Sequence, residues 1–349
     1  MQLGTPLSQY LIEEQRLYPE ATGSFTLLMN DIALACKTIS AAVRKGALVD
    51  VLGNAESDNC QGEQQKKLDI IANELFIKNN IWRGHIAAMA SEEMEEVYPI
   101  PDGQPKGKYL LVFDPLDGSS NIDVDGPIGT IFSIMRSDKE NPTEADFLQE
   151  GTKQVCAGYC LYGPATMIVI SIGHGTHAFT LDPDIGEFVL THKDIQIPED
   201  SAEYSINHSN RLGWEKPMLQ YVEDREAGKN GPKGKRYTMR WVGAMVMDVH
   251  RILMRGGMFA YPIDEGIRAK GGRLRLMYEA NPISFLVEQA GGIATTGYQR
   301  ILDVKPSGLH QRVPVIIGSK NEVTDILNYH KSYAEQNSME FNHKCKLFS

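Results

Sequence analysis

The most informative stretch of the chain is Phe113-Asp114-Pro115-Leu116-Asp117-Gly118-Ser119-Ser120-Asn121-Ile122-Asp123. The apolar run 109–113 leads into it and predicts a buried strand. Asp-Pro and Asp-Gly favour turns, so we predict that the chain turns sharply after Phe113. Asp114 and Asp117 offer oxygen ligands for a cation, and the small residues that follow offer backbone N–H groups for a phosphate. Taken alone, such a stretch is more often a solvated turn after a strand.

Composition and charge exclude several classes of protein. The chain has 349 residues, is 42% hydrophobic and carries a formal net charge of -10. This charge argues against general nucleic-acid binding, but an anionic substrate remains compatible with a metal and a few local cations. Five cysteines without a C-x-x-C pair indicate a reducing compartment. The N-terminus lacks the pattern of a signal peptide, and no apolar run approaches a bilayer span. We therefore expect a cytoplasmic protein that binds no nucleic acid and no membrane.

The length exceeds that of one typical core and suggests two domains. A segment with Asp-Pro and a further proline, 182–200, separates two patterns. We predict an N-terminal domain over 1–197, a C-terminal domain over 198–335 and a tail over 336–349.

Hydrophobic spacing predicts the main elements of the first domain. Apolar residues spaced for one helix face run from Ser24 toward Gly46. Alternating and apolar runs predict an antiparallel meander of three successive strands, over 154–161, 166–172 and 177–181. Cys156 and Cys160 lie in the first of these and are interpreted as core residues. We also predict a short strand over 48–52 and a polar, mobile segment over 54–62.

Acidic residues follow apolar strands at three places. They are Glu92 and Glu93 after 87–90, Asp114 and Asp117 after 111–113, and Glu279 after 276–278. Ligands bind at strand ends in open α/β sheets, and crowded acids repel one another unless cations hold them. An all-oxygen set suits magnesium or manganese, and no cluster of His or Cys favours zinc. Each acid alone is more often a charged helix start or turn; jointly, the metal interpretation is the better one.

The second half of the chain carries a group suited to anion binding. Its members are Asn207, Arg240, Tyr261, Lys270, Arg273 and Arg275. Arg273 and Arg275 are two positions apart, so on a strand they would share one face. Any single arginine is more often a solvated surface residue. A substrate with two phosphates would explain both groups, one phosphate at the metals and one at the arginines.

At these residues the sequence resembles class I fructose-1,6-bisphosphatases. The resemblance runs from about Leu7 to about Tyr329 in family order, and only sedoheptulose-1,7-bisphosphatases look comparably close. It is carried by the opening stretch 113–123, Ser91-Glu92-Glu93, Gly62-Glu63-Gln64 with Lys67-Leu68-Asp69, and Gly272-Arg273-Leu274-Arg275-Leu276-Met277-Tyr278-Glu279-Ala280-Asn281-Pro282.

The resemblance implies a fold and an activity. The fold is α/β (α+β layered), the five-layer α-β-α-β-α sandwich of the sugar phosphatase and inositol monophosphatase-like superfamily. The activity is Mg²⁺-dependent hydrolysis of the 1-phosphate of D-fructose 1,6-bisphosphate, a step of gluconeogenesis or the Calvin cycle. Two or three Mg²⁺ ions per subunit, with Mn²⁺ as a substitute, would activate the attacking water. The resemblance also suggests a homotetramer.

Site roles follow from the resemblance residue by residue. Those implied for the metals are Glu92, Asp114, the Leu116 carbonyl, Asp117, Glu279 and, near a third ion, Glu63. Asp69 and Glu93 would help to deprotonate the attacking water. The segment from Asp117 through Gly118 and Ser119 to Ser120 would donate to the 1-phosphate. The sugar and the 6-phosphate would be held by Asn207, Trp241, Tyr261, Arg273, Arg275 and, from a neighbouring subunit, Arg240.

Three departures from the family pattern bear on specificity and regulation. Arg273 stands where the family more often has Lys, which changes a point donor into a fork. Trp241 stands where a Tyr usually contacts the far phosphate, so one O–H donor is lost. Thr26, Lys108, Tyr109 and Arg136 match the family's AMP pocket, whereas Ser24 and Phe25 differ within its first turn. Thioredoxin control is not expected, because no long cysteine-bearing insert interrupts 140–175.

Three alternatives remain. The substrate could be sedoheptulose 1,7-bisphosphate, alone or in addition. A non-catalytic sugar-phosphate or AMP sensor would be expected to have lost some of the acids, yet all are present. An inositol-monophosphatase-like activity would not need the anion-binding group of the second half.

Overall fold

The computed structural model describes residues 2–17, 23–49, 53–58, 64–339 and 341. The chain divides into two compact units. The first comprises 1–148, 154–194 and 244–247, and the second comprises 149–153, 195–243 and 248–349. Each unit has a sheet and a buried apolar cluster of its own.

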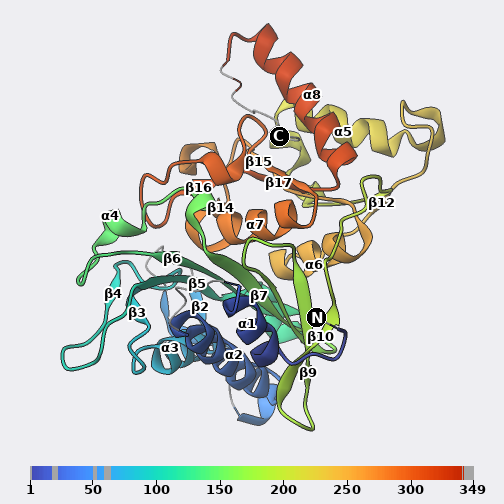
Figure 1. The fold of residues 1–349 in the computed structure, drawn as a ribbon. Coiled ribbons are helices and arrows are strands. Elements are labelled where there is room, and N and C mark those ends of the chain that lie inside the picture. The colour runs from blue at the N-terminus through green and yellow to red at the C-terminus, as the bar shows by residue number, and fades with distance from the viewer. Residues whose placement is uncertain (1, 18–22, 50–52, 59–63, 340, 342–349) are drawn as a thin grey trace. The chain divides into compact units, whose positions relative to one another are not determined.

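The first unit is built on an eight-stranded sheet with the order β10-β9-β8-β7-β6-β5-β3-β4 (Figure 1). Its strands are β3 (Ile86–Ser91), β4 (Tyr98–Pro99), β5 (Tyr109–Asp117), β6 (Ile128–Arg136), β7 (Cys156–Tyr162), β8 (Thr166–Ser171), β9 (His177–Asp182) and β10 (Glu187–His192). β3 and β5 are parallel, and the other neighbours are antiparallel. The predicted meander is confirmed by β7, β8 and β9.

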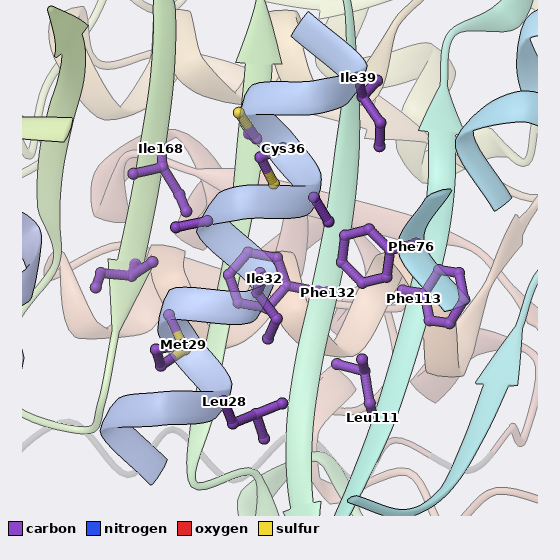
Figure 2. Close-up of a cluster of buried hydrophobic side chains, with 14 of the residues drawn as sticks. Leu28, Met29, Ile32, Cys36, Ile39, Phe76, Leu111, Phe113, Phe132 and Ile168 are labelled. Carbon is purple, nitrogen blue, oxygen red and sulfur yellow. The ribbon is translucent and has the colours of Figure 1, made fainter. Parts of the chain in front are cut away.

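Helices of the first unit lie over this sheet (Figure 1). They are α1 (Leu7–Gln15), α2 (Ser24–Val43) and α3 (Lys67–Asn80). The first unit also contains the single turn α4 (Glu144–Phe147) and a small ribbon in which β1 (Asn54–Asp58) pairs with β2 (Gln64–Lys66). Figure 2 shows Leu28, Ile32 and Ile39 of α2 in one buried cluster with Phe113 and Phe132 of the sheet. Their spacings of four and seven residues place them on one helix face, which explains why this helix could be predicted.

α2 also has the length and apolarity of a membrane-spanning helix. More than half of its most apolar window is buried inside the protein. Leu28, Met29, Ile32 and Ala35 are buried in the core cluster, as in the core helix of a globular domain. These contacts account for its composition.

The second unit contains a five-stranded sheet with the order β12-β11-β13-β17-β15. Its strands are β11 (Glu203–Ile206), β12 (Thr238–Met239), β13 (Met258–Tyr261), β15 (Ile293–Thr295) and β17 (Val315–Gly318), and a separate ribbon pairs β14 (Leu274–Arg275) with β16 (Arg312–Val313). Its helices are α5 (Lys216–Glu226), α7 (Asn281–Gln289) and α8 (Lys320–Gln336), while α6 (Met245–Arg255) begins in the first unit. β11 runs parallel to both β12 and β13.

A buried ionic network joins α5 to α8 in the second unit. Arg225 is fully buried, and its Nη2 lies 3.0 Å from a carboxylate oxygen of Glu322. Tyr221 and Tyr237 donate their hydroxyls to the same carboxylate at 2.9 and 2.8 Å. Removing one partner of such a network leaves an uncompensated buried charge, so this network fixes how the two helices pack.

Two predictions about local structure are wrong, and a third stays a prediction. The predicted strand over 48–52 begins in a 3₁₀ turn, η1 (Gly46–Val49), and its remainder lies outside the described residues. The segment predicted as mobile, 54–62, contains β1, which pairs with β2, and its residues 59–62 lie outside the described residues. The chain does not turn after Phe113, because β5 continues to Asp117.

Short helical turns complete the chain. They are η2 (Ser119–Val124), η3 (Gly151–Lys153), η4 (His208–Gly213), η5 (Gly228–Asn230), η6 (Arg268–Lys270), the π-helical turn η7 (Leu276–Ala280) and η8 (Ile301–Asp303).

Candidate active site

A β-bulge places Asp114 and Asp117 on the same side of β5. Asp114 pairs with Ile131 and Asp117 with Gly129, so two residues of β5 face only one of β6. Strand residues three apart normally point to opposite faces, but their partners here are two apart and share a face. The Thr130 hydroxyl donates to the Pro115 carbonyl at 2.8 Å and so holds the extra residue in place. The bulge thus explains why this acid spacing can build one site.

Glu92 reaches the same region through the parallel pairing of β3 with β5. Ser91 pairs with Phe113, and the N–H of Glu92 donates to the Phe113 carbonyl at 3.0 Å. Glu92 therefore follows the end of β3 directly beside Asp114. Their side chains, with that of Asp117, are only 5–8% exposed. Three acids buried within one unit repel one another unless a cation is present.

Asp69 and Glu93 form a second acidic pair at this edge. Asp69 lies in the first turn of α3, where one carboxylate oxygen accepts from the Lys66 N–H at 2.8 Å. The Ser91 hydroxyl donates to Asn73 of α3 at 2.7 Å and so ties α3 to the end of β3. Burial raises the pKa of Asp69 to about 7, opposed by the Lys66 N–H and reinforced by the charge of Glu93. Such a carboxylate can accept a proton near neutral pH.

Asp117 also fixes the start of α6. Its carboxylate accepts from the Val246 N–H at 2.8 Å. Gly118 follows with a positive φ of 80°, and a Cβ at this position would lie 2.5 Å from the Cβ of Ala244. The chain can therefore enter η2 past Ala244 only with glycine at position 118. Ser119 and Ser120 begin η2 and are half-buried and exposed, respectively.

The parallel strands of the second unit bring three predicted substrate residues to one edge. β11 pairs with β13 up to Ile206 and Ala260, so Asn207 and Tyr261 follow the paired ends directly. β12 pairs with β11 up to Met239, and the Arg240 N–H donates to the Tyr204 carbonyl at 2.8 Å. Ligand sites of α/β sheets lie beyond the carboxyl ends of parallel strands. Arg240 is exposed there, whereas Asn207 and Tyr261 are half-buried.

Trp241 is held by aromatic packing. Its ring stacks on Phe259 at a centroid distance of 6.0 Å and an interplanar angle of 1°. It also meets Tyr261 edge to face at 5.7 Å. The indole therefore lies at this edge beside Tyr261, which is predicted to hold the sugar.

The basic stretch before Glu279 differs from its prediction. β14 comprises only Leu274 and Arg275, so Arg273 precedes it and is exposed whereas Arg275 is buried; the two do not share a strand face. Glu279 lies in the π-helical turn η7 rather than after a strand. Its carboxylate accepts from the Arg275 N–H at 2.6 Å. Burial raises the pKa of Glu279, and the charges of Arg275, Arg312 and Arg273 oppose that rise.

The remaining members of the two predicted groups are placed as follows. Lys270 ends η6 and is exposed. The Leu116 carbonyl belongs to the bulge, and Leu116 donates its own N–H to Asp114 at 2.9 Å. Glu63 lies outside the described residues.

A separate cavity of about 1390 Å³ lies within the first unit. Its lining includes Lys108, Tyr109 and Arg136, three of the residues predicted for AMP, together with Ser24 and Phe25 of α2. The guanidinium of Arg136 lies 5.7 Å from the centre of the Tyr109 ring. Thr26, the fourth predicted residue, is buried, and its hydroxyl donates to the Gln15 side chain at 2.8 Å. The cavity thus combines cations with an aromatic face.

Two supporting features of the site were not predicted. Thr130 holds the bulge, and the Val246 N–H orients Asp117. A proline inside an otherwise apolar strand is a sequence signal for a bulge, so Pro115 could have revealed the bulge that Thr130 holds. The hydrogen bond from Val246 to Asp117 joins residues 129 positions apart, for which the sequence has no local signal.

Comparisons with known proteins agree on one family. The domain description "Fructose-1-6-bisphosphatase, N-terminal domain" matches residues 5–193, and "Fructose-1-6-bisphosphatase, C-terminal domain" matches residues 197–331. A curated relative, fructose-1,6-bisphosphatase class 1 of Halorhodospira halophila, is 57% identical over 336 residues, which covers 95% of this chain and 99% of the relative.

Solved structures give the same result. The holo form of Leishmania major fructose-1,6-bisphosphatase is similar with a TM-score of 0.88 and 40% identity, covering 95% of this chain and 100% of that one. The T-state form of that enzyme gives a TM-score of 0.84 and 38% identity, covering 94% and 99%. The layered α/β fold implied by the sequence is thereby confirmed.

Proposed function

The chain belongs to the class 1 fructose-1,6-bisphosphatase family, and from this premise we propose how its residues divide the hydrolysis of D-fructose 1,6-bisphosphate. The enzyme is a phosphoric monoester hydrolase that releases fructose 6-phosphate and phosphate. One set of residues carries out the chemistry at the 1-phosphate, and another set holds the sugar and the 6-phosphate. The observation that carries this proposal is the bulge that puts Asp114 and Asp117 beside Glu92.

The acidic residues assigned to the site are suited to binding divalent ions. Glu92, Asp114 and Asp117 are buried, and they supply carboxylate oxygens without any thiolate or imidazole, a donor set that suits Mg²⁺ or Mn²⁺. Asp114, Asp117 and Glu279 are acids that could hold a metal ion. We assign the carboxylates of Glu92, Asp114, Asp117 and Glu279 and the carbonyl of Leu116 as ligands of two ions. Glu63 is assigned to the neighbourhood of a third ion. Bound ions supply positive charge to the phosphate and make the attacking water more acidic.

Asp69 and Glu93 accept the proton of the attacking water. The raised pKa of Asp69, about 7, matches the Brønsted requirement for a general base at neutral pH. Water adds to phosphorus as the bond between phosphorus and the C1 oxygen breaks, and the proton that Asp69 and Glu93 took from the water is then available to neutralise the leaving alkoxide. Most of the catalytic effect is positioning and charge neutralisation, as is usual in phosphoryl transfer.

The two phosphates are recognised by different means. Backbone N–H groups of the Gly118–Ser120 segment donate to the 1-phosphate, which glycine at 118 allows because the chain passes so close to Ala244. Asn207, Tyr261, Arg273, Arg275 and Trp241 act on the sugar and the 6-phosphate, with Arg240 reaching them from a neighbouring subunit.

Regulation and assembly extend the proposal. The cavity with Lys108, Tyr109 and Arg136 is proposed to bind AMP, because cations and an aromatic face suit a nucleoside monophosphate. The existence of a T-state form of the Leishmania major enzyme supports allosteric control. We further propose a homotetramer in the cytoplasm, acting in gluconeogenesis or the Calvin cycle.

A phosphate-release assay tests the proposal. Fructose 1,6-bisphosphate should be hydrolysed with Mg²⁺ or Mn²⁺ and not after chelation by EDTA. Sedoheptulose 1,7-bisphosphate at equal concentration is the comparison, because the departures at Trp241 and Arg273 concern the sugar half. Adding AMP to wild-type enzyme and to Arg136→Ala tests the cavity: inhibition should be lost in the variant while its uninhibited rate is kept. Metal-independent hydrolysis would contradict the proposed mechanism.

A further inference from the structure

A buried carboxylate organises the segment 240–243. Asp248 lies on α6 and is only 2% exposed. One of its oxygens accepts from the Ser205 hydroxyl at 2.7 Å, and the other accepts from the Gly243 N–H at 3.2 Å. The Val242 N–H lies within 3.3–3.4 Å of both oxygens. All four residues belong to the second unit.

The segment that Asp248 holds carries two predicted substrate residues. Arg240 is anchored to β11 by its own N–H, and Trp241 packs on Phe259. Gly243 has a φ of +82°, a left-handed conformation that a side chain would strain. The N–H groups of Val242 and Gly243 donate to Asp248, and these hydrogen bonds therefore fix the backbone directly after Arg240 and Trp241.

An ordinary helix start explains only part of this arrangement. An acid in the first turn of a helix often reaches back to N–H groups that precede the helix. The bond from Ser205 has no place in that motif, because Ser205 lies 43 positions away on β11. Ser205 precedes Asn207 by two residues, so the same carboxylate is tied to the strand whose end presents Asn207.

We propose that Asp248 and Ser205 are positioning residues for recognition of the 6-phosphate and sugar. Together they set the segment 240–243 against the end of β11, and so hold Trp241 near the strand that ends at Asn207 and fix the backbone from which Arg240 reaches the neighbouring subunit. This inference rests on the proposed function of these three residues. Burial of Asp248 without its partners would be costly, so the contacts are retained in the folded enzyme.

The test compares substrate binding with turnover. Asp248→Ala removes all three contacts, and we expect the KM for fructose 1,6-bisphosphate to rise by roughly tenfold, as expected for lost hydrogen bonds to a charged group. Ser205→Ala removes one contact and should raise KM by about threefold. In both variants kcat and the Mg²⁺ concentration for half-maximal activity should stay within about twofold of the wild-type values, and the inhibition constant of fructose 6-phosphate should rise in step with KM.

Matched variants separate positioning from general destabilisation. Ser205→Thr keeps the hydroxyl and should restore KM. Ser319 is another buried serine of the second unit, and its hydroxyl bonds the Gly257 N–H at 2.9 Å and the Pro198 carbonyl at 2.6 Å. Ser319→Ala should lower the melting temperature without raising KM. The double variant Ser205→Ala with Asp248→Ala should raise KM no more than Asp248→Ala alone, because both act through one contact.

The outcomes distinguish this inference from the proposed function. If wild-type enzyme does not hydrolyse fructose 1,6-bisphosphate, the proposed function fails before the variants are compared. If it does, but Ser205→Ala leaves KM unchanged or lowers kcat as much as it raises KM, the positioning role is overturned. Should Asp248→Ala fail to fold, the comparison of Ser205→Ala with Ser205→Thr decides the question.

Discussion

The acids of the first unit and the substrate edge of the second are positioned by different kinds of interaction. Asp114, Asp117 and Glu92 are fixed by strand pairing, because the parallel register and the bulge set where each side chain points. Arg240 and Trp241 follow a two-residue strand, and side chains, chiefly Asp248 and Phe259, hold the segment. Backbone register tolerates little adjustment, whereas side-chain contacts can be changed one by one.

This difference predicts two patterns of response. Changes among the strand-held acids should abolish turnover, since the ligand geometry has no substitute. Changes along the segment 240–243 should alter substrate affinity and sugar preference by graded amounts. Trp241 and Arg273, which we predict to depart from the family pattern, belong to the second unit, and we expect changes at both to have graded effects.

Replacing Asp117 should have the largest effect. Asp117→Ala removes a proposed metal ligand, and kcat should fall by about 10⁴-fold or more, which corresponds to several kcal/mol of lost charge stabilisation. It also leaves the Val246 N–H without its acceptor, which should cost about 1–3 kcal/mol of stability. Steady-state kinetics and thermal unfolding measure both. Asp117→Asn, which keeps the acceptor, should regain the stability but not the turnover; near-normal activity in either variant would exclude Asp117 as a ligand.

Asp69 should govern the dependence on pH. Because burial raises its pKa to about 7, kcat/KM should rise with pH until about 7 and then level off. Asp69→Asn should lower kcat by roughly 10³-fold and remove this rise. A profile of kcat/KM from pH 5 to 9 checks the prediction, and an unchanged acidic limb in the variant would assign it to another group.

The same pKa has a consequence for stability. A carboxyl group whose pKa is higher in the folded protein than its ordinary value, 3.8, favours folding when protonated. The stability from this group is present below that ordinary value and is lost as pH rises through about 7. Asp69→Asn should therefore flatten the decline in unfolding free energy over this range, measured without metal by urea titration.

Gly118 should show an intermediate effect. Gly118→Ala combines a left-handed φ with a Cβ that would lie 2.5 Å from that of Ala244. The turn must shift, and a displacement of about 1 Å can cost roughly 10²-fold in rate. Kinetics at saturating Mg²⁺ measure the loss. Gly103→Ala is the matched control, because Gly103 also has positive φ but no atom within 4 Å of an added Cβ; equal losses in the two variants would refute a specific role for close approach.

Trp241 should show the smallest effect. Trp241→Tyr introduces the hydroxyl that the sequence resemblance implies for this position but removes the indole stacked on Phe259. A hydrogen bond to a charged group and an aromatic stack have comparable magnitudes, so KM for fructose 1,6-bisphosphate should change by only about threefold. The ratio of kcat/KM for fructose and sedoheptulose bisphosphates is the measurement; a change above about a hundredfold would show that Trp241 determines the substrate.

Features with a local signal could be predicted from the sequence. The face of α2 repeats at helical spacing, and the strands β7 to β9 are separated by turn-forming residues, so both were predicted correctly. The resemblance to the phosphatase family also identified the fold. These features depend on residues close together in the chain or on motifs of high specificity.

Features that depend on residues far apart in the chain could not be predicted from the sequence. Asp-Pro and Asp-Gly indicated a turn, but the pairing of β5 with β6 turned the same residues into a bulge within a strand. β1 forms by pairing with β2, and the π-helical turn η7 stands where a strand before Glu279 was expected. The proposed role of Asp248 depends on its hydrogen bonds with Ser205 and Gly243, and no local sequence pattern predicts these bonds.

The central claim is that metal binding and sugar binding depend on separable sets of residues. Titrating Asp117→Ala with Mn²⁺, followed by electron paramagnetic resonance, and with fructose 6-phosphate, followed by calorimetry, tests it most directly. We predict that the variant loses Mn²⁺ binding by about a hundredfold or more but keeps the wild-type affinity for fructose 6-phosphate within about threefold. Mn²⁺ binding with wild-type affinity, or an equal loss of both ligands, would contradict the division.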